Sequence, residues 1–418
     1  MQFAYFDEDF ITARSQTTAV NSLAKYRAHV QTVVQKRDGT KPEYSLVHAA
    51  DSTLHTTLDQ IATQFKGIQH LVLVGIGGSN LGTEAVHAAL GEGKVQLHTL
   101  DTIAPYQLEA VVKKLSRVKT AKKIAVCVIS KSGNTAETLV NASVLLEQLE
   151  KKFKNAIYKQ TVFIGNAKTD FMKAGKKLGV TCVPMPEIVG GRYSVATEVG
   201  LVPLRLLGHD VDSFIGGVLD ASAEPFEPVV AEHAARTYSY VKKGYSHYNF
   251  FAFEPRLEQL GGWYRQLQAE SLGKVKDKSG KVVKTGFVPT VSTAVELHSV
   301  GQLYLSGLAN VYTDFVVFDD ADCDYKVAKA SIAKKYAKHT MQDVSTGIYG
   351  GVMQAYQEKN LPYRSTIFDD GNLAYSLGLF MSMRMLETMY TANLMNLNAF
   401  DQPNVELYKD KTRKILKI

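Results

Sequence analysis

The sequence predicts an α/β protein whose parallel sheets are covered by helices on both faces, and three observations support this class. Short, continuous apolar runs recur along the chain, and segments with helical periodicity separate them. The length of 418 residues exceeds what one ordinary hydrophobic core supports, so two domains are expected. Hydrophobic residues make up 45% and charged residues 21%, a globular composition that excludes disordered and fibrous classes.

The first half shows the alternation most clearly. Residues 1–50 are expected to form a peripheral helical extension, and residues 51–215 a doubly wound α/β domain. Strands are predicted at 71–74, 95–100, 124–129, 161–164 and 180–183. Helical patterning at 81–90 and 135–152 lies between them.

The second half, residues 216–418, repeats the pattern less clearly and is expected to be a second domain with a C-terminal helical segment. Strands are predicted at 248–253, 286–289, 315–318 and 365–368, and a long buried helix at 373–397. The sequence AEPFEP at 223–228 interrupts the periodicity, so a linker is predicted around 208–230.

Charge and composition exclude several function classes. Lys and Arg number 48 and Asp and Glu 41, which gives a net charge of +7 that suits an anionic small molecule as well as it suits nucleic acid. Aromatic residues do not interleave the lysine clusters, so no nucleic-acid partner is expected. No apolar run approaches the roughly 18 residues of a membrane span. With no leader pattern at the N-terminus, a cytoplasmic location is expected.

Three cysteines, Cys127, Cys182 and Cys323, form no CxxC pair. Neither a disulfide framework nor a structural zinc site is therefore predicted, and no metal ligand cluster is visible. A reducing compartment fits this cysteine usage.

Two glycine- and hydroxyl-rich turns each follow a predicted strand and open a helix. The glycines of GIGGSNLG at 75–82 do not have dinucleotide-binding spacing, and an anion site and a plain tight turn remain equally supported. The turn SKSGNT at 130–135 places three hydroxyls, a glycine and a lysine at a helix N-terminus. A phosphate site is favoured there over simple N-capping by Ser132.

Local sequence is less informative at three other positions. Arg192 follows paired glycines and could enter a cleft, but from local sequence a surface arginine on a turn is favoured. Glu270 and His298 are single titratable residues, and solvated or structural roles are favoured from local sequence alone.

Six segments taken together resemble the glucose-6-phosphate isomerase (phosphoglucose isomerase) family in its short microbial form. They are GIGGSNLG at 75–82, SKSGNT at 130–135, GGRYS at 190–194, ESLGK at 270–274, ELHS at 296–299 and FDQPNVELYK at 400–409. They occur in the family's order over most of the chain. The resemblance implies two αβα sandwich sugar-isomerase (SIS) domains and reversible isomerisation of glucose 6-phosphate and fructose 6-phosphate through a cis-enediol, in glycolysis and gluconeogenesis.

The resemblance also implies roles for individual residues. Glu270 matches the base that moves a proton between C1 and C2, and Arg192 matches the group that stabilises the enediolate. His298 and Lys409 match residues that assist ring opening. The implied substrate contacts are Gly78, Ser79, Ser130, Lys131, Ser132, Thr135, Gln266 and Gln402. No cofactor or metal is implied, and the implied assembly is a homodimer with shared active sites, in which His298 reaches the neighbour's site.

The chain departs from the family pattern at four positions, and the sequence leaves two alternative functions to consider. Leu272 stands where the family often has Asn, and Pro403, Asn404 and Tyr408 also depart from it, which bears on substrate fit. One alternative is a dual phosphoglucose/phosphomannose isomerase, against which Gln402 argues. The other is a sugar-phosphate-sensing regulator built on SIS domains. Such a regulator could lose Glu270, His298 or Lys409, and the presence of all three argues against it.

Overall fold

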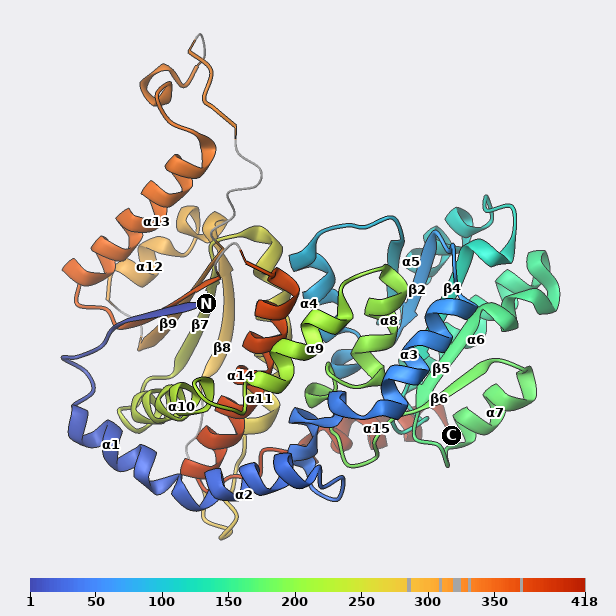
Figure 1. The fold of residues 1–418 in the computed structure, drawn as a ribbon, viewed down its shortest axis with the longest axis horizontal. Helices are drawn as coiled ribbons and strands as arrows, with labels where there is room; N and C mark the ends of the chain where they lie inside the picture. Colours follow the sequence, from blue (N-terminus) through green and yellow to red (C-terminus); the bar gives the residue numbers. More distant parts are fainter. Residues whose placement is uncertain (284–286, 308–309, 319–324, 330–331, 369–370, 418) are drawn as a thin grey trace.

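The computed structural model describes residues 1–283, 287–307, 310–318, 325–329, 332–368 and 371–417. Two five-stranded sheets lie side by side, with helices packed between them (Figure 1). The predicted α/β class with parallel sheets is confirmed. Gly286, where the strand predicted at 286–289 begins, and Cys323 lie outside the described residues.

The first sheet has the order β3-β2-β4-β5-β6 and is parallel throughout. Its strands are β2 (His70–Val74), β3 (Gln96–Leu100), β4 (Ile124–Ile129), β5 (Thr161–Gly165) and β6 (Thr181–Pro184). All five were predicted within a residue at either end. Leu71 and Leu73 enter one hydrophobic cluster and Val72 and Val74 another, because successive side chains point to opposite faces. The sheet is therefore buried on both sides.

Six helices cover these two faces. On one side lie α3 (Ser52–Gln64), α4 (Leu81–Leu90) and α8 (Glu198–Leu207), and on the other α5 (Pro105–Leu115), α6 (Ala136–Phe153) and α7 (Asp170–Leu178). The predicted helices at 81–90 and 135–152 correspond to α4 and α6.

The second sheet has the order β1-β10-β9-β7-β8. Its strands are β1 (Gln2–Phe6), β7 (His247–Ala252), β8 (Val288–Thr293), β9 (Val311–Phe318) and β10 (Tyr363–Phe368). The four later strands were predicted, although β8 continues four residues past its predicted end and β9 begins four residues before its predicted start. The edge strand β1 was not predicted. It pairs antiparallel with β10, with Gln2 opposite Ile367. In the expected N-terminal extension, α1 (Ala13–Ser22) and α2 (Ala24–Lys36) are helical.

The helices of the second half are α9 (Val211–Asp220), α10 (Phe226–Lys242), α11 (Glu258–Leu272), α12 (Gly301–Leu305), α13 (Met341–Glu358), α14 (Leu373–Leu394) and α15 (Glu406–Leu416). Most of them cover the two faces of this sheet, whereas α9 packs on α14, and α15 buries none of its residues. The long predicted helix is α14, which ends three residues earlier than expected. Figure 1 shows α13 on the outer side of this sheet, where its Tyr356 packs against Phe315 of β9.

The segment predicted as a linker around 208–230 is instead structured, since it holds α9 and the start of α10. Helix α9 packs closely on α14. A Cβ atom at Gly217 would lie 2.0 Å from the Tyr375 carbonyl oxygen, and one at Gly378 would lie 2.0 Å from the Phe214 carbonyl oxygen. Glycine at positions 217 and 378 therefore allows the backbones of α9 and α14 to approach each other closely.

Four charged side chains form a buried network between the second sheet and α14. Arg364 contacts Asp314 at 2.8 Å and Glu387 at 3.2 Å, while Arg384 contacts Asp314 at 2.5 Å and Glu387 at 2.8 Å. Each side chain is at most 2% exposed. Two cations and two anions balance each other, which offsets their loss of hydration. Although α14 is long and largely apolar, no helix of the described residues could cross a membrane.

We expect Asp314→Asn to destabilise the fold by about 3–5 kcal/mol, because two buried guanidinium groups lose their shared carboxylate. Urea unfolding at fixed protein concentration measures this loss. Asp170→Asn, which removes an exposed partner of Lys173, is the control and should leave the midpoint unchanged. Equal midpoints for Asp314→Asn and the wild type would contradict a structural role for the network.

Candidate active site

The glycine- and hydroxyl-rich turns meet because of the sheet topology. The turn at 75–79 follows β2 and the loop at 130–135 follows β4, and the carboxyl ends of parallel strands lie at one edge of a sheet. The segment at 190–194 comes after β6 at the same edge. The fold thus places three separate predicted motifs on one side of the first sheet, facing α11 of the second half.

Arg192 is the centre of this cluster. It lies in the short 3-10 turn η6 (Gly191–Tyr193) and is only 3% exposed. Its donors contact Ser271 Oγ at 2.8 Å, Glu270 Oε2 at 3.2 Å, Gln402 Oε1 at 2.7 Å, the Ala399 carbonyl at 2.6 Å and the Asp401 carbonyl at 3.1 Å. Two stretches of sequence, residues 270–271 and 399–402, therefore converge on the guanidinium, although both are distant from residue 192.

Glu270 lies at the end of α11, and its side chain is 32% exposed. One carboxylate oxygen pairs with Arg192, and the other accepts a hydrogen bond of 3.0 Å from Gln266 Nε2. Gln266 and Glu270 share a helix face because they are four residues apart. The carboxylate is thus held at both oxygens, yet it is open enough to meet a small molecule.

The turn after β2 packs directly on the arginine loop. A Cβ atom on Gly78 would lie 2.2 Å from the Gly191 carbonyl carbon and 2.6 Å from the Arg192 nitrogen. A Cβ atom on Gly77 would lie 2.8 Å from Gln266 Nε2. Glycine at these positions therefore brings the turn that carries Gly78 and Ser79 next to both Arg192 and α11.

The loop at 130–135 leads into α6 and leaves that helix without a side-chain cap. The N-cap residue is Thr135, which makes no capping hydrogen bond. Ser132 Oγ accepts from the Asn134 N–H at 3.3 Å, so the simple alternative of α6 capping by Ser132 does not hold. Ser130 Oγ donates to Thr135 Oγ1 at 3.4 Å. Hydroxyls and a helix N-terminus accordingly lie together, as an anion site requires.

Lys131 connects this loop to the arginine loop. Its ammonium donates to the Val189 carbonyl at 2.8 Å, and burial lowers the pKa of Lys131, with a smaller contribution from the charge of Arg192. The two cations therefore lie on the same side of the site.

Sequence reasoning missed three residues that support the cluster. Ser271 accepts from Arg192 and bonds Tyr193 Oη at 2.9 Å. Lys274 donates to the Glu270 carbonyl at 2.8 Å, contacts Asp401 Oδ1 at 2.9 Å and donates to the Asp401 carbonyl. Burial lowers the pKa of Lys274. All three residues lie in segments that carry the family resemblance: Ser271 and Lys274 in ESLGK, and Tyr193 in GGRYS. Membership of these segments is the sequence signal that could have identified them.

The structure does not bring His298 and Lys409 into this cluster. His298 ends the 3-10 helix η8 (Ala294–His298) and is exposed. Lys409 lies on α15, where its ammonium contacts Glu406 at 2.7 Å, and its side chain is 42% exposed. No side chain of α15 is buried within the chain.

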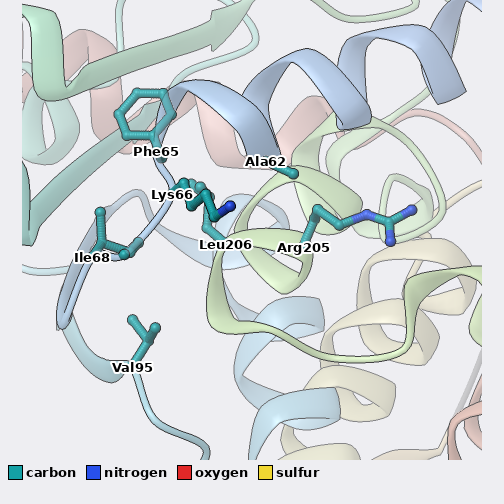
Figure 2. A pocket seen from close by; sticks show the side chains of 8 residues that line it. Ala62, Phe65, Lys66, Ile68, Val95, Arg205 and Leu206 are labelled. Atoms are coloured by element: carbon teal, nitrogen blue, oxygen red, sulfur yellow. The ribbon is translucent and has the colours of Figure 1, made fainter.

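A cavity of about 160 Å³ lies at the opposite edge of the first sheet (Figure 2). Ile68 precedes β2 and Val95 precedes β3, so this cavity faces the amino ends of the strands. Lys66 and Arg205 also line it, but Asp212 engages Arg205 at 2.8 and 3.1 Å. This cavity therefore lies apart from the cluster around Arg192, which is at the carboxyl ends of the strands. Within the described part of the chain, no three His, Cys, Asp or Glu side chains form a group that could hold a metal ion.

Comparisons with known proteins identify relatives over nearly the whole chain. A family model described as phosphoglucose isomerase matches residues 14–418. A glucose-6-phosphate isomerase of Thermus thermophilus is 30% identical, and the match covers 84% of each chain. The glucose-6-phosphate isomerase of Mycoplasmopsis synoviae is 28% identical, with 98% of each chain covered.

Solved structures show the same fold. A hypothetical protein from Thermus thermophilus has a TM-score of 0.84 at 25% identity, covering 99% of this chain and all of that one. A glucose-6-phosphate isomerase from Chlamydia trachomatis has a TM-score of 0.83 at 17% identity, covering 99% and 88%.

We expect Gly78→Ala to lower any turnover at this site by about 10–100-fold, because the added methyl group forces the 75–79 turn away from Arg192 by about an ångström. Steady-state kinetics measure the change. Gly347→Ala on α13, where a Cβ atom meets nothing within 4 Å, is the matched control and should keep full activity. A Gly78→Ala protein with wild-type turnover would show that the close approach of the two loops is irrelevant to catalysis.

Proposed function

Because the chain belongs to the phosphoglucose isomerase family, we propose that it interconverts glucose 6-phosphate and fructose 6-phosphate through a cis-enediol. The observation that carries the proposal is the contact of 3.2 Å between Glu270, which can accept a proton, and the buried cation of Arg192. The reaction moves a proton between neighbouring carbons with no net redox change. It is a step of glycolysis and gluconeogenesis.

Glu270 is the base. From glucose 6-phosphate in its open form, the carboxylate takes the proton from C2, and the electrons of the C2–H bond form the C1–C2 double bond. The carbonyl electrons move onto O1, which becomes an oxyanion. A proton then passes from the O2 hydroxyl to O1, so that the negative charge lies on O2. The electrons on O2 form the C2 carbonyl, and the C1–C2 double bond takes the proton back from Glu270 at C1, which gives the ketose. Gln266 orients the carboxylate through its hydrogen bond to Oε1.

Arg192 stabilises the oxyanion. As Glu270 becomes a neutral acid, the negative charge passes to the sugar, and the guanidinium remains beside it. Because arginine keeps its charge at any working pH, Arg192 stabilises this charge without giving up a proton.

The loop at 130–135 binds the phosphate group. A phosphate monoester carries about −1.5 to −2 charges and several acceptor oxygens. The hydroxyls of Ser130, Ser132 and Thr135 and the uncapped N-terminus of α6 supply donors for them. Lys131 adds positive charge at the side facing Arg192.

Ring opening is assigned to His298 and Lys409, with a second copy of the chain completing each site. Within one chain both side chains reach solvent and lie away from Arg192. Helix α15 also presents Leu407 and Ile415, which are 67% and 79% exposed, to the outside. A homodimer would cover such apolar side chains and bring His298 to the neighbour's Glu270.

A purely sugar-phosphate-sensing protein is less consistent with the geometry. Binding requires donors for the phosphate and hydroxyl groups. A partly exposed carboxylate beside a buried arginine is not needed for binding, but it can serve in proton transfer. Glu270 and its oriented second oxygen therefore favour catalysis over sensing.

We expect Glu270→Gln to lower kcat by at least about 100-fold while substrate binding changes little, because the amide keeps the shape but cannot accept the proton. The assay couples fructose 6-phosphate turnover to glucose-6-phosphate dehydrogenase, and calorimetry measures binding. Glu258→Gln, at the exposed start of the same helix, is the control. Near-normal kcat in Glu270→Gln would remove this residue from the mechanism.

Shared sites predict that two inactive variants restore each other. When Glu270→Gln and His298→Ala chains are unfolded together and refolded, half of the dimers are mixed, and each mixed dimer has one intact site. About a quarter of the wild-type activity should return. Pairing Glu270→Gln with the Glu270→Gln/His298→Ala double variant is the control, which should stay inactive. A dead first mixture, with mixed dimers verified by tagged chains, would mean that His298 acts within its own chain.

A further inference from the structure

The guanidinium of Arg192 has no donor to spare. Its five N–H groups comprise one on Nε and two on each terminal nitrogen. Nε donates to Ser271, Nη1 to Glu270 and Gln402, and Nη2 to the carbonyls of Ala399 and Asp401. Any substrate oxygen that binds Arg192 must therefore displace one of these five acceptors.

The acceptors of Nη2 are difficult to displace because both are backbone carbonyls. The segment at 399–402 that carries them is held by Lys274, which contacts Asp401 and also the carbonyl of Glu270 at the end of α11. The Ala399 carbonyl further accepts from Tyr193 Oη at 3.4 Å. Freeing Nη2 would require the main chain to move.

The acceptor of Nε is equally fixed. Ser271 is fully buried on α11, and its hydroxyl is held by Tyr193 Oη at 2.9 Å. Tyr193 is itself 1% exposed. The serine hydroxyl is thus fixed between the arginine and a tyrosine that has no room to turn.

The two acceptors of Nη1 differ from the rest, since both are side chains open to solvent. Gln402 is exposed and Glu270 is partly exposed. Rotation of the Gln402 amide about its own bonds frees one N–H of Nη1, and the main chain need not move. That N–H lies on the nitrogen that also contacts the proposed base.

We propose that Ser271, held by Tyr193, is a positioning residue that orients Arg192 so that only Nη1 is offered to the enediolate, and that Gln402 occupies this donor until substrate replaces it. The inference rests on the proposed isomerisation and specifies how its charge is stabilised. Proton transfer to Glu270 then exchanges one anion at Nη1 for another: the carboxylate loses its charge as the sugar oxygen gains it. Arg192 stabilises first the carboxylate and then the sugar oxyanion without rotating.

The decisive variant is Ser271→Ala. Without its Nε acceptor, Arg192 can rotate, so kcat should fall about 10–100-fold while KM changes less than about threefold. Two inhibitors, used as probes, distinguish a misoriented Arg192 charge from a general loss of packing in Ser271→Ala. Affinity for an aldonate phosphate, whose carboxylate is a planar anion at the reacting end, should fall with kcat. Affinity for the matching sugar-alcohol phosphate, which is neutral there, should stay within about twofold.

Matched variants complete the experiment. Ser382→Ala removes a buried hydroxyl on α14 for which the described residues provide no hydrogen-bond partner, and it should leave both affinities and kcat unchanged. Ser271→Thr keeps the hydroxyl and should recover most of the lost kcat. Tyr193→Phe should cost less than Ser271→Ala, and the double variant should resemble Ser271→Ala alone, because both act through one hydroxyl.

Three outcomes would overturn the proposal: unchanged kcat in folded Ser271→Ala, equal loss of affinity for both probes, or additive effects of the two substitutions. If Ser271→Ala fails to fold, Tyr193→Phe and Ser271→Thr decide the question through the same two probes. Failure of the isomerase assignment would look different, because the wild-type chain would then turn over neither sugar phosphate.

Discussion

The burial of a single guanidinium organises the site. A charged group that is 3% exposed loses most of its hydration, and it is tolerated only where every N–H finds an acceptor. For Arg192 those acceptors come from the end of α11 and from the segment just before α15. Neither lies near residue 192 in sequence. Satisfying the arginine therefore requires the first and second halves to dock in one arrangement.

Backbone proximity supports the same arrangement. The turn that carries Gly78 touches the loop of Arg192 with no side chain between them, and the second glycine, Gly191, lies on the other side of that contact. Two loops at the edge of one sheet are thereby fixed relative to each other before any ligand arrives. Catalysis by electrostatic stabilisation depends on such preorganisation, because donors already aimed at the developing charge need not reorganise.

The sequence predicted what depends on local pattern. Nine of the strands, the α4 and α6 helices and the motif loops follow from periodicity and from turn residues. Long-range contacts were not predictable in the same way: β1 is a short edge strand whose partner lies near the other end of the chain, and the supposed linker is helical because Gly217 and Gly378 allow α9 to pack on α14. Ser271 lies in the ESLGK segment that carries the family resemblance, but the local pattern does not indicate its role, because that role depends on long-range contacts with Arg192 and Tyr193.

The pairing of β1 with β10 has a consequence for how the protein is made. Residues 2–6 leave the ribosome long before their partner, Tyr363–Phe368, is synthesised. At translation rates of about 5–20 residues per second, the N-terminal strand waits roughly 20–70 s for its partner. During that interval the first sheet can form, because its strands all precede residue 185. The nascent chain therefore carries an unpaired strand with Phe3 and Tyr5 until residues 363–368 are made, and such a segment is suited to chaperone capture.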